Sequence, residues 1–221
     1  MTAFVAVFLP LLASLGFWQI GRADEKRDRQ ELVFERLAML PVAVPESMEG
    51  MEYRHVRLQG VFELNRYFLL DNQMVQGRPG YWIIASFLAD DSRRWLVNRG
   101  WVQAPPVREH LPEVGWVEGP VTLTGIVWPQ LGLVPLLAED VWPETWPKRV
   151  QRMNVARMAA ALDNTEAVEI RLEAGQPGVM KPVRLYTGVG VERHLGYAAQ
   201  WFGLAIVLIV GYVFFGLKRG G

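Results

Sequence analysis

Two long apolar stretches lie near the ends of the chain, and a mixed segment separates them. The first runs from Thr2 to Ile20 and contains only three polar residues, namely Thr2, Ser14 and Gln19. The second runs from Leu195 to Leu217 without a charged residue. At about 1.5 Å of rise per residue, each stretch can cross the roughly 30 Å hydrocarbon core of a bilayer. The pattern predicts two transmembrane helices.

A cleaved signal peptide is the alternative for the first stretch. No basic residue precedes the stretch and its apolar run is long, so we expect residues 1–21 to be a retained transmembrane helix. Charges of both signs follow, with Leu32, Val33, Leu37 and Leu40 at rough helical spacing, which predicts that residues 22–40 continue the helix out of the membrane. Residues 193–221 are predicted to form the second transmembrane helix and a short basic tail.

Residues 22–192 form the predicted extramembrane domain. Short runs of period two predict strands, Gly- and Pro-rich turns separate them, and one later stretch has helical spacing. The expected strands are Tyr53–Phe62, Arg66–Asp71, Tyr81–Leu88, Arg94–Val102, Val121–Trp128 and Ala167–Leu172, and the expected helix is Val150–Leu162. The predicted fold class is a membrane protein in which two transmembrane α-helices flank a β-rich α+β domain with a mainly antiparallel sheet.

A loop from Trp128 to Trp146 is unusually rich in tryptophan, proline and leucine. Its tryptophans each precede a proline, and Leu131, Leu133, Leu136 and Leu137 lie between them. Three roles are open for such a loop: it rests on a membrane, it covers a partner protein, or it packs over its own sheet.

The composition removes several classes of function. The 221 residues carry 23 basic and 23 acidic side chains with no basic stripe, so we expect no nucleic-acid partner. The absence of cysteine excludes disulfides, iron–sulfur ligation, thiol nucleophiles and c-type haem attachment. The sequence contains no common hydrolase, metalloprotease or nucleotide-binding motif, and we predict neither an enzyme nor a catalytic residue. His55 is expected to be a solvated side chain on a strand.

One group of residues near the apolar stretches could bind a ligand. His194 opens the second stretch and shares a helix face with Tyr197 and Trp201, while Trp18 and Arg22 share a face at the end of the first. These side chains either anchor the helices at the lipid interface, or His194 ligates a metal or haem iron beside aromatic neighbours.

Five blocks of sequence resemble the Surfeit-locus family of cytochrome c oxidase assembly factors, and in particular its bacterial members. The blocks are Leu15-Gly16-Phe17-Trp18-Gln19 with Arg22 and Lys26; Tyr53-Arg54 with Val56, Gly60 and Phe62; Pro79-Gly80-Tyr81; Leu96-Val97-Asn98-Arg99-Gly100-Trp101-Val102; and His194-Leu195-Gly196-Tyr197-Ala198 with Trp201-Phe202. They follow the family's order and cover both apolar stretches and most of the middle.

The resemblance implies a non-enzymatic membrane protein for the biogenesis of aa-type haem–copper oxidases, acting where haem a enters the catalytic subunit. It implies haem a as a stable or transient ligand, with His194 as the candidate ligand of the haem iron. Tyr197, Trp201, Trp18 and Arg22 become candidate contacts with the haem or the oxidase. The implied partners are membrane lipid, the oxidase catalytic subunit and the machinery that makes and inserts haem a. A scaffold that binds no haem and a membrane-tethered periplasmic hydrolase are the alternatives.

Two features depart from what the resemblance implies. Glu192 and Arg193 precede His194, where an asparagine-rich approach is expected.

The family topology is a multi-pass protein of the bacterial inner membrane, with a periplasmic central domain and both termini in the cytoplasm. The basic residues that follow the first span instead favour a cytoplasmic middle by the positive-inside rule. Long domains translocate largely regardless of charge, so we give the resemblance precedence.

Overall fold

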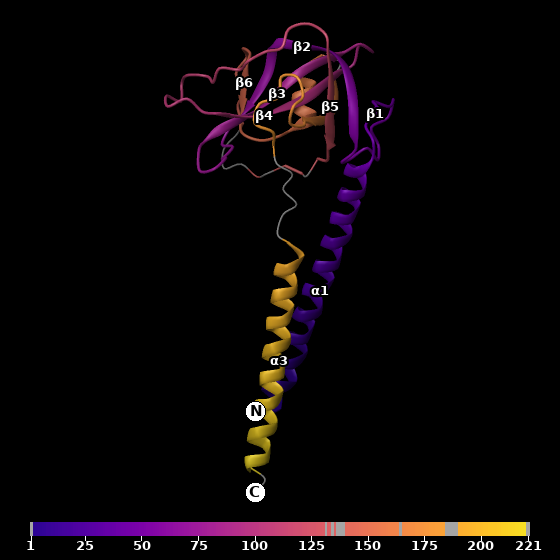
Figure 1. The fold of residues 1–221 in the computed structure, drawn as a ribbon. Helices are drawn as coiled ribbons and strands as arrows, with labels where there is room; N and C mark the ends of the chain where they lie inside the picture. Colours follow the sequence, from indigo (N-terminus) through magenta and orange to yellow (C-terminus); the bar gives the residue numbers. More distant parts are fainter. Residues whose placement is uncertain are drawn as a thin grey trace. The chain divides into compact units, whose positions relative to one another are not determined.

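The computed structural model describes residues 2–130, 132–133, 135, 140–163, 165–183 and 190–219, with the backbone alone for Leu217 and Arg219. The chain divides into two compact units. A helical unit comprises Met1–Glu35 and Leu185–Gly221, and a middle unit comprises Arg36–Arg184. Figure 1 shows the two long helices and the sheet that make up these units.

The helical unit pairs α1 (Thr2–Ala38) with α3 (Val191–Arg219). Both helices are long and apolar enough to cross a membrane. α1 continues without a break beyond its apolar part to Ala38, and its last three residues belong to the middle unit. The predicted boundaries of the membrane-spanning parts stay predictions, because the structure contains no bilayer.

The two helices run antiparallel and pack closely. Thr2 Oγ1 lies 3.3 Å from the hydroxyl of Tyr212, and the rings of Phe17 and Phe202 meet edge to face at 5.2 Å. A Cβ atom on Gly16 would lie 2.6 Å from the Phe202 ring, so any larger residue there would displace that ring. Small residues allow helices to approach in this way where no hydrophobic effect drives their association. Gly16 therefore supports the pairing of the two helices.

The described residues of the middle unit form a mixed sheet of seven strands. These are β1 (Val42–Ala43), β2 (His55–Leu70), β3 (Gly80–Ala89), β4 (Arg94–Gln103), β5 (Val121–Trp128), β6 (Lys148–Val150) and β7 (Thr165–Leu172). β2 pairs with β3, β3 with β4, β4 with β7 and β7 with β5, and β5 returns to β2. The five strands therefore form a closed barrel, which leaves no free sheet edge among them.

Alternation along the barrel strands separates an inner from an outer core. The inner core contains residues from all five strands, including Phe87, Trp95, Val97, Leu123 and Ile170. The residues next to them in sequence point to the opposite face of the sheet. There, Ile84 and Leu96 pack with Phe68 and Val150 against α2 (Val155–Ala160). The barrel is thus filled inside and covered by a short helix on part of its outside.

The structure confirms the fold class and corrects several details. The two strands expected at Tyr53–Phe62 and Arg66–Asp71 are one strand, β2, whose register with β3 shifts between Phe62 and Tyr67. β7 pairs parallel with β4, which the long connection through β5, β6 and α2 permits, and it pairs antiparallel with β5.

The expected helix Val150–Leu162 is shorter than predicted. Val150 belongs to β6, and α2 starts only after Asn154, whose side chain accepts a hydrogen bond from the Arg157 amide. This N-cap satisfies a backbone donor that has no partner within the helix, so the helix starts there.

His55, expected to be solvated, is buried, and its Nε2 lies 3.0 Å from Glu173 Oε1. The prediction was wrong because alternation does not reveal the neighbours of a strand: His55 lies opposite Ile126 of β5, and Glu173, just after β7, reaches its ring.

The tryptophan-rich loop packs at least partly on its own domain. The rings of Trp142 and Trp146 lie 5.5 and 5.0 Å from the ring of Phe68, and the Arg157 guanidinium lies 3.9 Å from the Trp142 ring. Leu131, Leu136 and Leu137 lie outside the described residues. Of the three roles left open, packing over the sheet accounts for these two tryptophans.

Candidate functional site

His194 lies in the first turn of α3 and contacts α1 through a hydrogen bond. Its Nδ1 is 2.9 Å from Oε1 of Gln19. An amide oxygen can only accept, so Nδ1 carries the proton in this contact. The neutral tautomer then has its lone pair on Nε2, which has no hydrogen-bond partner among the described residues. The helix pairing therefore presents an imidazole nitrogen that is free to ligate a metal.

The other predicted site residues are Trp18, Arg22, Tyr197 and Trp201, and they differ in whether they line the cavity beside this imidazole. Arg22 lines the same cavity as His194, and its guanidinium lies 5.7 Å from the Trp18 ring and 2.8 Å from Glu25. Tyr197 and Trp201 follow His194 on α3 but do not line that cavity. Tyr197 is 47% exposed, so its ring is available to a ligand or to lipid.

The cavity beside His194 has a volume of about 210 Å³ and a charged lining. Arg22, Glu25, Lys26 and Arg29 of α1 form its wall together with His194. Gln19 and Arg29 were not among the residues predicted for the site. Gln19, Arg22 and Lys26 follow one another at i, i+3 and i+7, so helical spacing could have placed Gln19 on the cationic face. Spacing could not show that this face meets His194.

The residues present fit a haem. A porphyrin supplies four nitrogen ligands itself, so a single imidazole with a free Nε2 is a sufficient protein donor. Within the described residues, no group of three or more His, Asp or Glu side chains could hold a bare metal ion. Exposed aromatic rings suit a flat macrocycle, and basic side chains suit its carboxylates.

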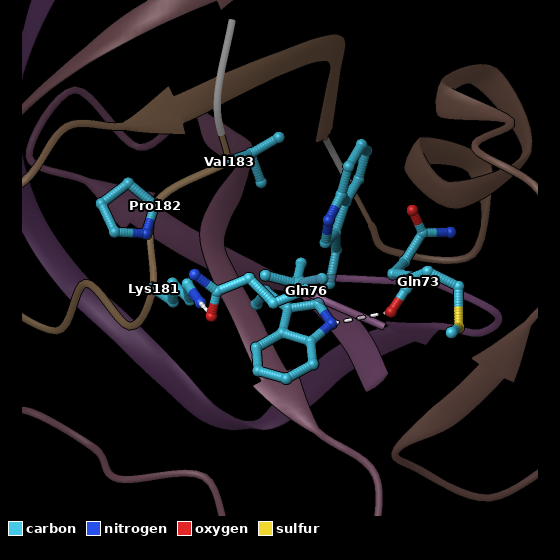
Figure 2. Close-up of a pocket in the computed structure, with 9 residues that line it drawn as sticks. Gln73, Gln76, Lys181, Pro182 and Val183 are labelled. Atoms are coloured by element: carbon cyan, nitrogen blue, oxygen red, sulfur yellow. Dashed lines mark hydrogen bonds between the residues drawn. The ribbon is translucent and has the colours of Figure 1, made fainter. Parts of the chain in front are cut away.

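A second cavity, of about 300 Å³, lies in the middle unit (Figure 2). Its lining joins the turn after β2, the tryptophans of β3 and β4, and the segment after β7: Gln73, Met74, Val75, Gln76, Trp82, Trp101, Lys181, Pro182 and Val183. Its polar groups are largely paired with one another. Trp101 Nε1 donates to the Gln73 carbonyl at 2.8 Å, and Lys181 Nζ donates to Gln76 Oε1 at 3.1 Å.

The close packing of this wall depends on two glycines. A Cβ on Gly80 would lie 2.3 Å from Trp101 Nε1, and one on Gly100 would lie 2.3 Å from the Lys181 carbonyl oxygen. Gly100 also has a φ of 101°, which disfavours other residues. Close packing therefore accounts for a glycine in each of two blocks that carry the family resemblance.

Arg99, in the same block as Gly100, is a buried cation. Its Nε donates to the Gly178 carbonyl at 2.8 Å, and its guanidinium lies 4.5 Å from the Trp116 ring and 5.0 Å from the Phe62 ring. No carboxylate of the described residues forms an ion pair with it. Burial lowers the pKa of Arg99 to about 10, so the side chain is still charged at neutral pH. Arg99 also donates to the Gly115 carbonyl, so it ties the loops that contain Gly115 and Gly178 to the end of the barrel.

Comparison with known proteins gives one consistent family. The model of the SURF1 family matches residues 6–206. A SURF1-like protein of Rickettsia conorii is 27% identical, over 96% of this chain and 89% of the relative. A SURF1-like protein of Monosiga brevicollis is 31% identical, over 93% of this chain and 84% of the relative. The human Surfeit locus protein 1 is 25% identical, over 91% of this chain and 73% of that protein.

Proposed function

Because the chain belongs to the SURF1 family, we propose that it is a non-enzymatic assembly factor for an aa-type haem–copper cytochrome c oxidase. In this proposal it receives haem a through His194 and delivers it to the catalytic subunit. The haem is cargo rather than a resident cofactor. The family resemblance supports the role in oxidase assembly, and the helical unit supports the binding of haem.

The observation that carries haem binding is the contact between Gln19 and His194. This hydrogen bond orients the ring and leaves Nε2 without a partner among the described residues, which is the state an iron ligand requires. A histidine that only anchored a helix would direct its polar nitrogens to water and headgroups. Here one nitrogen is held by the neighbouring helix instead.

The proposed location is a bacterial inner membrane, with the barrel domain in the periplasm and both termini in the cytoplasm. Two apolar helices, one before and one after the middle unit, support this topology, because a chain that crosses the bilayer twice would carry the segment between its spans on one side. The family resemblance supports the periplasmic side. His194 would then lie at the periplasmic surface, where the two spans emerge.

The test compares His194→Ala with His110→Ala, the same change at an exposed loop residue. Both proteins are purified in full length from cells that make haem a, and the haem absorbance is normalised to protein. We expect His194→Ala to lose most of the copurified haem and His110→Ala to retain it. Membrane insertion should be normal in both, because the apolar spans are unchanged.

Undiminished haem in the His194→Ala protein would remove the ligand assignment and favour the scaffold that binds no haem. Oxidase activity of the same strains provides a second readout. If His194→Ala also leaves the yield of assembled oxidase unchanged, the site has no role in assembly. Turnover of a substrate by the haem-free protein would contradict the non-enzymatic assignment.

A further inference from the structure

The polar end of α1 has no net charge but separates its charges by face. Four bases and four acids lie between Arg22 and Glu31. At about 100° per residue, Arg22, Lys26 and Arg29 fall within an arc of about 60°. The acids Asp24, Asp28 and Glu31 fall on the opposite side, within about 60°. The helix therefore presents a cationic face although its total charge is zero.

This cationic face borders His194. Three bases and one carboxylate line the cavity beside the imidazole, and three minus one leaves two positive charges. Arg22 is the base that pairs with Glu25, at 2.8 Å. Lys26 and Arg29 form no ion pair with any residue that the structure describes. Arg27, on another face, is paired with Asp24 at 3.1 Å. Lys26 and Arg29, the bases of this segment without an ion-pair partner among the described residues, thus both line the cavity.

We propose that this cavity binds the carboxylate groups of the molecule that His194 ligates, with Lys26 and Arg29 as the binding residues. The inference rests on the proposed function and adds to it the recognition of the ligand's anionic groups. Two uncompensated charges match the two carboxylates of a porphyrin, and each charge-assisted contact would be stronger beside an apolar span than in bulk water. A lipid phosphate has the same oxyanion chemistry and is the competing source.

The test separates the carboxylates from the ligated iron by using two porphyrins. The full-length protein in neutral detergent is titrated with protohaem and with protohaem dimethyl ester, whose carboxylates are blocked, and binding is followed in the Soret band. We expect the wild type to bind the free acid roughly tenfold more tightly than the ester, from two contacts of surface strength. The double variant Lys26→Gln/Arg29→Gln should bind the acid as weakly as the ester, with the affinity for the ester unchanged.

Arg27→Gln is the matched control, because it removes a base of the same helical turn that does not line the cavity. It should leave both affinities unchanged. His194→Ala should weaken both porphyrins, since both depend on the iron ligand.

Equal affinities of acid and ester for the wild type would overturn the inference and leave the ligand assignment intact. Failure of the wild type to bind either porphyrin would refute the proposed function and this inference together. The lipid source is examined in bilayer nanodiscs containing phosphatidylglycerol. Loss of bound phosphatidylglycerol in the double variant, without a difference between acid and ester in the wild type, would assign the cavity to lipid phosphate and refute the proposal.

Discussion

Replacing Glu169 by glutamine tests a buried ion pair within β7 whose two side chains also contact β4 and β5. Glu169 is almost fully buried, and its carboxylate accepts from Arg171 Nε at 2.7 Å and from Asn98 Nδ2 at 2.7 Å. The Arg171 side chain is only 12% exposed, and its guanidinium lies 3.7 Å from the Trp128 ring. Glutamine keeps the size of the side chain but removes its charge. The variant therefore leaves a buried guanidinium without its counter-charge.

The expected loss of stability follows from the burial of both Glu169 and Arg171. Removing one partner of a buried pair costs about 3–5 kcal/mol, whereas an exposed pair contributes at most about 1 kcal/mol. Arg171 keeps its contact with Trp128, which is worth up to about 2 kcal/mol when desolvated, so we expect the lower limit of about 3 kcal/mol. For a domain of this size, that loss lowers Tm by about 6–12 °C.

The assay is thermal unfolding of the full-length protein in detergent, followed by tryptophan fluorescence. Glu166→Gln is the matched control, because Glu166 lies on the same strand and forms no ion pair among the described residues. It should change the free energy of unfolding by no more than about 0.5 kcal/mol. The double variant Glu169→Gln/Arg171→Met should be less destabilised than the sum of its single changes. A Glu169→Gln protein as stable as the Glu166→Gln protein would refute the reasoning.

Three further predictions concern the helical unit and the topology. Gln19→Leu removes the acceptor for His194 Nδ1. It should weaken haem binding about 10- to 100-fold and shift the reduction potential of the haem. An unchanged spectrum and potential would show that Gln19 does not position the ring. Trp18→Ala should reduce oxidase assembly more than Val207→Ala, although both side chains are more than half exposed, and equal yields of oxidase would leave Trp18 as a lipid anchor. A reporter that is active only outside the cytoplasm, inserted at the hairpin turn after Asp90, should be active, whereas activity of a cytoplasmic reporter there would reverse the topology.

Local patterns were enough to predict the two apolar helices and most strands. The uncharged run Leu195–Leu217 and the alternation in Arg94–Val102 each reflect one continuous environment, lipid in the first case and a two-faced sheet in the second. The polar residues after Phe62 led to the prediction of two strands where the structure has one, β2. The register of β2 shifts there, and a bulged strand exposes polar side chains as a loop does. The helical extension of the first span was likewise predictable from spacing.

Only the tertiary structure decided how these elements meet. The closed ring requires β5 to pair with both β7 and β2, and the buried state of His55 depends on that closure. Strand periodicity gives the direction of side chains but carries no information about which strands are neighbours.

The candidate site shows the same division. The sequence alone identified His194, Trp18 and Arg22 as candidates from residue type, spacing and resemblance. It assigned no role to Gln19, which lies 175 positions from His194 and reaches it only because the two spans pair at Gly16 and Phe202. A contact of this kind depends on the packing of two distant helices, so no local pattern in either helix can specify it.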